Sequence, residues 1–268
     1  MQGSFWVVET EFGPVIATAI HAGHSVREEI EPKFAISEED RLREEDPFTD
    51  IFTWDLHSRI IVNHSRFEVD LNRPRDKAVY QKPEDAWGLE VWKTALSEAE
   101  LAESLRFYDA FYDEMKRYFD RVQEKYGNFV VLDIHAYNHH RQGPDAPFDD
   151  PLENPDINVG TRTLKNPEKW RHMIDGTIAY LKVADFLGKV LDVRENVKFG
   201  GGYFAEWIHE NYAPNACVLS LEFKKFFMDE WTGKGDEVQI RQIRKMVGSL
   251  LPLLERELGA LKGQDGTI

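Results

Sequence analysis

The segment Phe129-Val130-Val131-Leu132-Asp133-Ile134-His135 is a nearly continuous apolar run that ends on a histidine. Such runs are typical of strands at the centre of a parallel sheet, where both faces are buried. Residues 96–126, just before it, carry apolar side chains at steps of three and four, which predicts a long helix that ends at Gly127. A helix that leads straight into a buried strand is typical of an α/β fold.

The rest of the chain continues this alternation. Further strands are expected at residues 5–8, 14–20, 59–62 and 216–222, further helices at 167–188 and 236–259, and loops at 27–50, 141–160 and 198–203. This order predicts one α/β domain over residues 1–268, with a mostly parallel sheet covered on both faces. In such folds ligands bind outside the carboxyl ends of the strands. Polar residues that follow strands are therefore the candidates for function.

The bulk composition excludes several partners. The net charge of −15 argues against nucleic acid or an anionic membrane surface, although a local basic pocket could still bind a small anionic substrate. No run of 18 apolar residues is present, and the N-terminus carries no secretory signal, so we expect a cytoplasmic protein. The single cysteine, Cys217, cannot form an intramolecular disulfide and is expected to be buried.

Three histidines follow predicted strands. His21 and His24 come directly after residues 14–20, and His135 ends the central strand. A catalytic zinc site needs three protein ligands, and imidazole is a common one. Asp133 lies two residues before His135, where it could orient a ligand. The alternative is that these are ordinary polar residues at strand ends, but three together favour a metal site.

Two further patterns suit a hydrolase. Arg66 and Arg73 flank a short stretch that includes Asn72, and an arginine fork matches a carboxylate. Spacing alone favours surface ion pairs for these arginines. Glu222 ends the strand 216–222, where it is either a base beside a metal or an exposed strand-end side chain.

At these residues the sequence resembles the N-formylglutamate amidohydrolase family, which belongs with the zinc carboxypeptidases and aspartoacylases. The similarity spans most of the chain in the family's order. Its segments are Ile20-His21-Ala22-Gly23, residues 65–74 (Ser-Arg-Phe-Glu-Val-Asp-Leu-Asn-Arg-Pro), Leu132-Asp133-Ile134-His135, Gly201-Gly202-Tyr203, Leu219-Ser220-Leu221-Glu222 and Met228-Asp229-Glu230.

The resemblance implies a three-layer α/β/α sandwich with a mixed, mostly parallel sheet and one zinc ion. It implies that His21 and His135 are zinc ligands and that Glu222 is the catalytic carboxylate. It also implies that Arg66, Asn72 and Arg73 bind the carboxylate of a small anionic substrate.

The third zinc ligand departs from the family pattern. Related zinc hydrolases have glutamate three residues after the first ligand, where this chain has His24. The family draws an acidic ligand from a later segment, which here would supply Asp46. We expect His24, with Asp46 as the alternative.

The expected reaction is zinc-dependent hydrolysis of an N-acyl acidic amino acid, with N-formyl-L-glutamate as the first candidate substrate. The alternatives are a carboxypeptidase, another N-acyl amino acid deacylase, or a non-catalytic binding protein that keeps the fold. A larger substrate, contacted by the loop at 141–160, is a further possibility. The sequence leaves the oligomeric state open.

Overall fold

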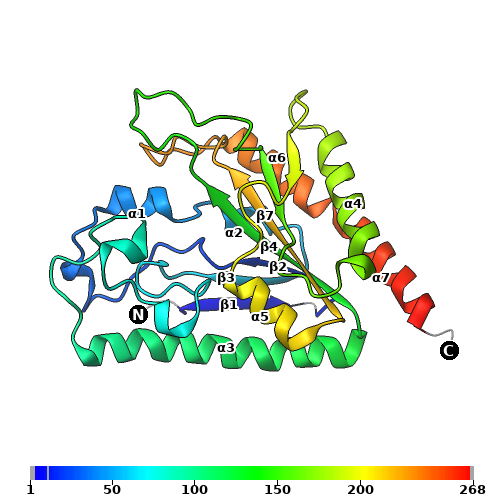
Figure 1. The fold of residues 1–268 in the computed structure, drawn as a ribbon, viewed down its shortest axis with the longest axis horizontal. Helices are drawn as coiled ribbons and strands as arrows, with labels where there is room; N and C mark the ends of the chain where they lie inside the picture. The colour runs from blue at the N-terminus through cyan, green and yellow to red at the C-terminus, as the bar shows by residue number, and fades with distance from the viewer. Residues whose placement is uncertain (1–3, 11, 266–268) are drawn as a thin grey trace.

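The computed structural model describes residues 4–10 and 12–265. Its centre is a seven-stranded sheet in the order β1-β3-β2-β4-β7-β5-β6 (Figure 1). The strands are β1 (Trp6–Thr10), β2 (Val15–Ala19), β3 (Ser58–Val62), β4 (Phe129–Tyr137), β5 (Ile157–Gly160), β6 (Val193–Glu195) and β7 (Ala216–Lys224). The four central strands β3, β2, β4 and β7 are mutually parallel. β1 and β5 pair antiparallel with β3 and β7, so the sheet is mixed, as predicted.

Helices cover both faces of the sheet (Figure 1). One apolar cluster joins the sheet to α3 (Glu98–Tyr126) and α5 (Tyr203–Tyr212). The other joins the opposite face to α2 (Thr49–Phe52), α4 (Pro167–Val183), α6 (Glu237–Gly248) and α7 (Leu251–Asp265). The short helix α1 (Glu38–Glu44) lies in the connection between β2 and β3. The expected three-layer α/β/α architecture is confirmed.

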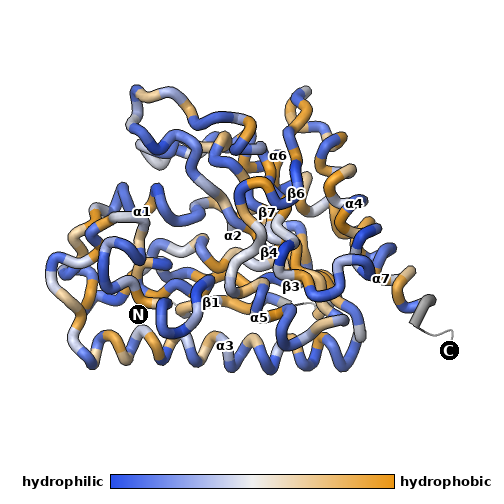
Figure 2. Tube along the Cα trace, viewed as in Figure 1, coloured by the Kyte–Doolittle hydropathy of each residue, from blue (hydrophilic) through white to orange (hydrophobic). Residues whose placement is uncertain are grey.

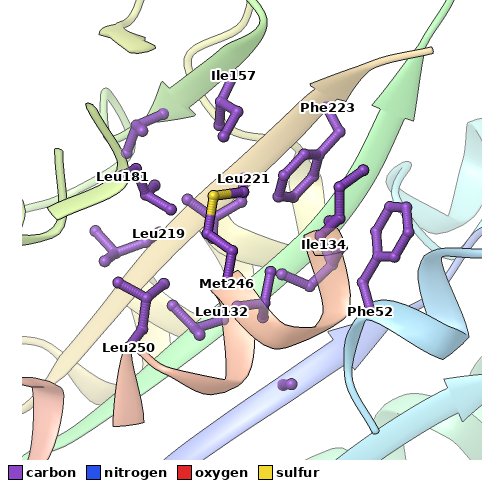
Figure 3. Packing of buried hydrophobic residues seen from close by; sticks show 14 of the residues in the cluster. Phe52, Leu132, Ile134, Ile157, Leu181, Leu219, Leu221, Phe223, Met246 and Leu250 are labelled. Atoms are coloured by element: carbon purple, nitrogen blue, oxygen red, sulfur yellow. The ribbon is translucent and has the colours of Figure 1, made fainter. Parts of the chain in front are cut away.

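The central strand β4 contributes to both layers. Leu132 and Ile134 pack in the cluster that includes α4, α6 and α7. Figure 3 shows them beside Met246 and Leu250. Val131, just before Leu132, packs with the α3–α5 cluster. This alternation follows from the two-residue period of a strand. Cys217 is fully buried in the first of these clusters, as expected.

Helix α3 ends where the sequence predicts and starts two residues later than predicted. Ser97 accepts a hydrogen bond from the Glu100 backbone N–H, and the Glu100 side chain bonds back to the Ser97 N–H, which forms a capping box. Gly127 ends the helix with φ 72°, a conformation that glycine adopts readily. Hydrophobic and hydrophilic residues alternate along the helix in Figure 2. The buried hydrophobic side chains of the helix pack against the sheet.

Several expected boundaries differ from the structure. The predicted loop at 141–160 ends in strand β5, and both β6 and α5 were missed. These elements are short, and a period is hard to detect over three to ten residues. The predicted helix at 236–259 is two helices, because Pro252 cannot donate to a preceding carbonyl and so begins a new helix rather than continuing α6. Among the described helices, none has the length and hydropathy needed to span a bilayer.

His209 makes the fold sensitive to acid. It lies in α5 at 1% exposure, its Nε2 atom accepts from the Val218 N–H, and its Nδ1 atom lies 2.9 Å from Thr163 Oγ1. The ring must therefore be neutral to accept, and burial lowers the pKa of His209 to about 4. Because an unfolded histidine titrates near 6.5, the stability from this site is complete above pH 6.5 and is lost as the pH falls toward 4.

We expect the loss to be roughly 3 kcal/mol in the free energy of unfolding. Urea unfolding of the wild type and of His209→Gln, with chelator present, measures it. The stability advantage of the wild type should shrink between pH 7 and pH 4. An advantage that does not change with pH would show that His209 is not kept neutral by the fold.

Candidate active site

A buried group of two histidines and one aspartate lies at the carboxyl ends of β2 and β4. His21, Asp46 and His135 each offer a ligand atom, and these atoms lie within 4.8 Å of one another. The Nδ1 atoms of His21 and His135 lie 3.6 and 3.0 Å from Asp46 Oδ2. Because β2 and β4 are adjacent and parallel, residues at their ends meet on the same edge of the sheet.

Each histidine of this group is held by a second carboxylate. His21 Nε2 lies 2.7 Å from Asp70 Oδ1, and His135 Nε2 lies 3.0 Å from Asp133 Oδ2. Thr18 donates to the other oxygen of Asp133 at 2.7 Å. Pairing of the far ring nitrogen with a carboxylate is the usual arrangement around metal-ligating histidines. The Nδ1 atoms and Asp46 thus form a donor set that fits zinc.

Asp46 reaches this group from the connection between β2 and β3. Its backbone N–H donates to the carbonyl of His21 at 3.0 Å. Lys225, which is 1% exposed, donates to the carbonyls of Arg43 and Glu45 at 2.6 and 2.7 Å. These bonds fix the turn that carries Asp46. Sequence reasoning missed Lys225, because a lysine three residues beyond Glu222 carries no signal of burial.

His24 lies outside this group and does not line the cavity that His21, His135 and Glu222 share. Its Nδ1 atom lies 2.5 Å from Glu45 Oε2, and the ring lines a second cavity. The hydrogen bond to Glu45 raises the pKa of His24. At Gly23 the chain passes close to Asn63, and a Cβ atom there would lie 2.1 Å from the Asn63 carbonyl carbon. The structure therefore brings Asp46, rather than His24, to the two histidines.

Glu222 lies beside His135. The two residues are paired in the register of β4 and β7, and both line the same cavity as His21 and Asp46. Burial raises the pKa of the Glu222 carboxyl to about 7, while the nearby imidazoles of His135 and His21 oppose the rise. A carboxyl group whose pKa lies near neutrality suits proton transfer.

Arg66, Asn72 and Arg73 line this cavity, whose volume is about 400 Å³. Arg66 donates to Asp70 Oδ2 at 2.7 Å, and Arg73 Nε lies 3.6 Å from the same oxygen. Asp70 thereby joins the two arginines to His21. Both guanidinium groups also lie over the ring of Trp87, at 4.9 and 5.8 Å from its centroid.

The glycine segment Gly200–Gly202, just before α5, packs against Asn72. The Phe204 N–H donates to Asn72 Oδ1 at 2.9 Å. A Cβ atom on Gly202 would lie 2.2 Å from the Asn72 amide, so only glycine permits this approach. The segment therefore forms a wall of the cavity, although the sequence predicted only a loop.

The comparisons with known proteins agree with this fold. The family model described as N-formylglutamate amidohydrolase matches residues 13–227. The crystal structure of N-formylglutamate amidohydrolase from Ralstonia eutropha JMP134 aligns with TM-score 0.72 and 15% identity over 94% of this chain and 98% of that one. A gene product from Agrobacterium tumefaciens aligns with TM-score 0.67 and 18% identity over 97% of each chain. At these identities the structures show a shared fold. The search of curated proteins found no match.

Proposed function

This chain belongs to the N-formylglutamate amidohydrolase family, and from that premise we propose that it hydrolyses N-formyl-L-glutamate to L-glutamate and formate with one zinc ion. The observation that supports this most strongly is the buried group of His21, Asp46 and His135 on the wall of the cavity that Arg66 and Arg73 also line.

The donor set supports zinc as the metal. Two imidazoles and one carboxylate leave a fourth position open, as catalytic zinc sites require. A zinc ion bound there would supply a Lewis acid for the acyl carbonyl and would make water more acidic. The outer carboxylates Asp70 and Asp133 would hold the two rings in the binding orientation.

Glu222 is the proposed proton carrier. It would take a proton from the attacking water and deliver it to the amide nitrogen as the C–N bond breaks. Its place beside His135 supports this role. A neighbouring cation lowers the pKa of a carboxyl group, so Glu222 would be ionised and ready to act as a base at neutral pH.

Arg66, Asn72 and Arg73 would hold the glutamate part of the substrate. The two arginines share the single carboxylate of Asp70, so each retains N–H groups for a ligand. A carboxylate ligand that binds both guanidinium groups would be fixed in orientation as well as attracted.

A substrate panel tests the function. Zinc-loaded protein should release formate from N-formyl-L-glutamate faster than it cleaves N-acetyl-L-leucine or a dipeptide. Arg73→Gln should raise KM about tenfold or more, because a hydrogen bond between charged groups contributes roughly 1.5–3 kcal/mol. Faster cleavage of dipeptides would instead support a carboxypeptidase. Substrate binding without turnover in the zinc-loaded protein would support a binding protein.

A further inference from the structure

We propose that the cavity holds a second anion-binding subsite at Lys198 and Arg141, apart from the Arg66–Arg73 clamp, and that the enzyme also accepts substrates whose acyl group carries its own carboxylate. The proposal rests on the proposed amide hydrolysis and goes beyond it by assigning the acyl side. The chemical class is an N-acyl amino acid whose acyl chain ends in a carboxylate.

Lys198 is the main argument for this subsite. Its Nζ atom donates to the neutral side chain of Asn154 and lies over the ring of Tyr137, 5.0 Å from the centroid. Among the described residues no carboxylate forms an ion pair with Lys198, and Asp149, Glu153 and Glu230 act on its charge only from farther away. Partial burial lowers the pKa of Lys198. A bound carboxylate would offset that cost.

Arg141 adds a second positive charge to this part of the cavity. Its Nη2 atom donates to Glu44 Oε2 at 3.0 Å, which neutralises part of the charge, and other N–H groups remain. Asn138, which lines the same cavity, is 2% exposed and its Oδ1 atom has no hydrogen-bond partner among the described residues. Buried acceptors are normally paired, so this atom points to a ligand that carries an N–H group.

The clamp and Lys198 belong to different parts of the sheet. The clamp residues follow β3, which lies beside β2, whereas Lys198 is hydrogen-bonded to Asn154, just before β5 and beyond β7. Arg141 pairs with Glu44, which lies two residues before Asp46. In the order of the strands, the His21–Asp46–His135 group at β2 and β4 therefore lies between the clamp and Lys198.

This arrangement assigns the two ends of a substrate. If the clamp holds the amino acid and the scissile carbonyl lies at the buried histidines, the acyl chain extends toward Lys198. Hydrolysis would add the oxygen of water to the acyl carbon, break the C–N bond and transfer a proton to the leaving amine. The products are a dicarboxylic acid and an amino acid. A formyl group is too short to reach a second anion subsite, whereas a cavity of about 400 Å³ is within the range that encloses larger ligands.

The test compares N-succinyl-L-glutamate with its neutral isostere, N-succinamoyl-L-glutamate. In the zinc-loaded wild type we expect kcat/KM to be at least about tenfold higher for the succinyl compound. Lys198→Met should bring this ratio close to one. Lys189→Met, the same change at an exposed lysine outside the cavity, should keep the wild-type ratio. Arg73→Gln should lower both rates and also keep the ratio.

Each other outcome is decisive. A wild-type ratio near one, with N-formyl-L-glutamate still cleaved, overturns the subsite and leaves the proposed function standing. A high ratio that survives Lys198→Met overturns the role of Lys198. If no N-acylglutamate is cleaved, the proposed function fails. Calorimetric titration of succinate, with L-glutamate present to fill the clamp, then tests the subsite alone. Lys198→Met should weaken succinate binding about tenfold, and equal affinity overturns the proposal.

Discussion

Replacing Glu222 by glutamine is expected to lower kcat for amide hydrolysis by roughly 100- to 10,000-fold, the usual contribution of a positioned acid–base group. Glutamine keeps the size of the side chain but cannot accept a proton from water. Glu222 is paired in register with His135 and lines the same cavity, so we expect its carboxylate to lie near the reacting water and amide nitrogen.

The measurement is kcat at saturating substrate in protein whose zinc content has been determined. Glu222→Gln should bind zinc as the wild type does, since Glu222 is not one of the three proposed ligands. Matching circular dichroism spectra would show that the fold is intact. A zinc-loaded variant with the wild-type kcat would remove Glu222 from the mechanism.

Asp46→Ala is expected to reduce zinc affinity by more than about 100-fold, because loss of an outer partner alone costs 10- to 100-fold. His24→Ala should retain zinc. The two variants should differ in zinc affinity because of where the side chains lie. Asp46 Oδ2 lies 3.6 and 3.0 Å from the Nδ1 atoms of His21 and His135, whereas the His24 ring pairs with Glu45.

Competition with a chromophoric chelator gives the two affinities directly. The His24→Ala variant serves as the matched control, because it removes a neighbouring candidate ligand from the same connection. Zinc loss from His24→Ala together with zinc retention by Asp46→Ala would reverse the assignment and restore the ligand first expected from the sequence.

The strand-end residues of the site were predictable from the sequence. His21, His135 and Glu222 follow or end strands with clear apolar patterns, and the parallel-sheet rule brings such ends to one edge. The three-layer fold followed from the alternation of strands and helices, together with the family resemblance. These inferences needed local periods, a general rule of topology and the family resemblance.

The choice between His24 and Asp46 as the third proposed metal ligand could not be made from the sequence in the same way. Asp46 lies in a 38-residue connection between β2 and β3 whose path depends on long-range contacts. The bonds from Lys225 to the carbonyls around Asp46 join segments about 180 residues apart, and no local pattern encodes them. His24 follows His21 closely in sequence, but its ring pairs with Glu45 outside the group.

The most direct test is the release of formate from N-formyl-L-glutamate as zinc is titrated into metal-free protein. We predict no activity without zinc, a rise in proportion to added metal, and a plateau at one equivalent per chain. Activity that is equally high in the metal-free protein, or formate release that stays absent at one equivalent of bound zinc, would contradict a single-zinc amidohydrolase.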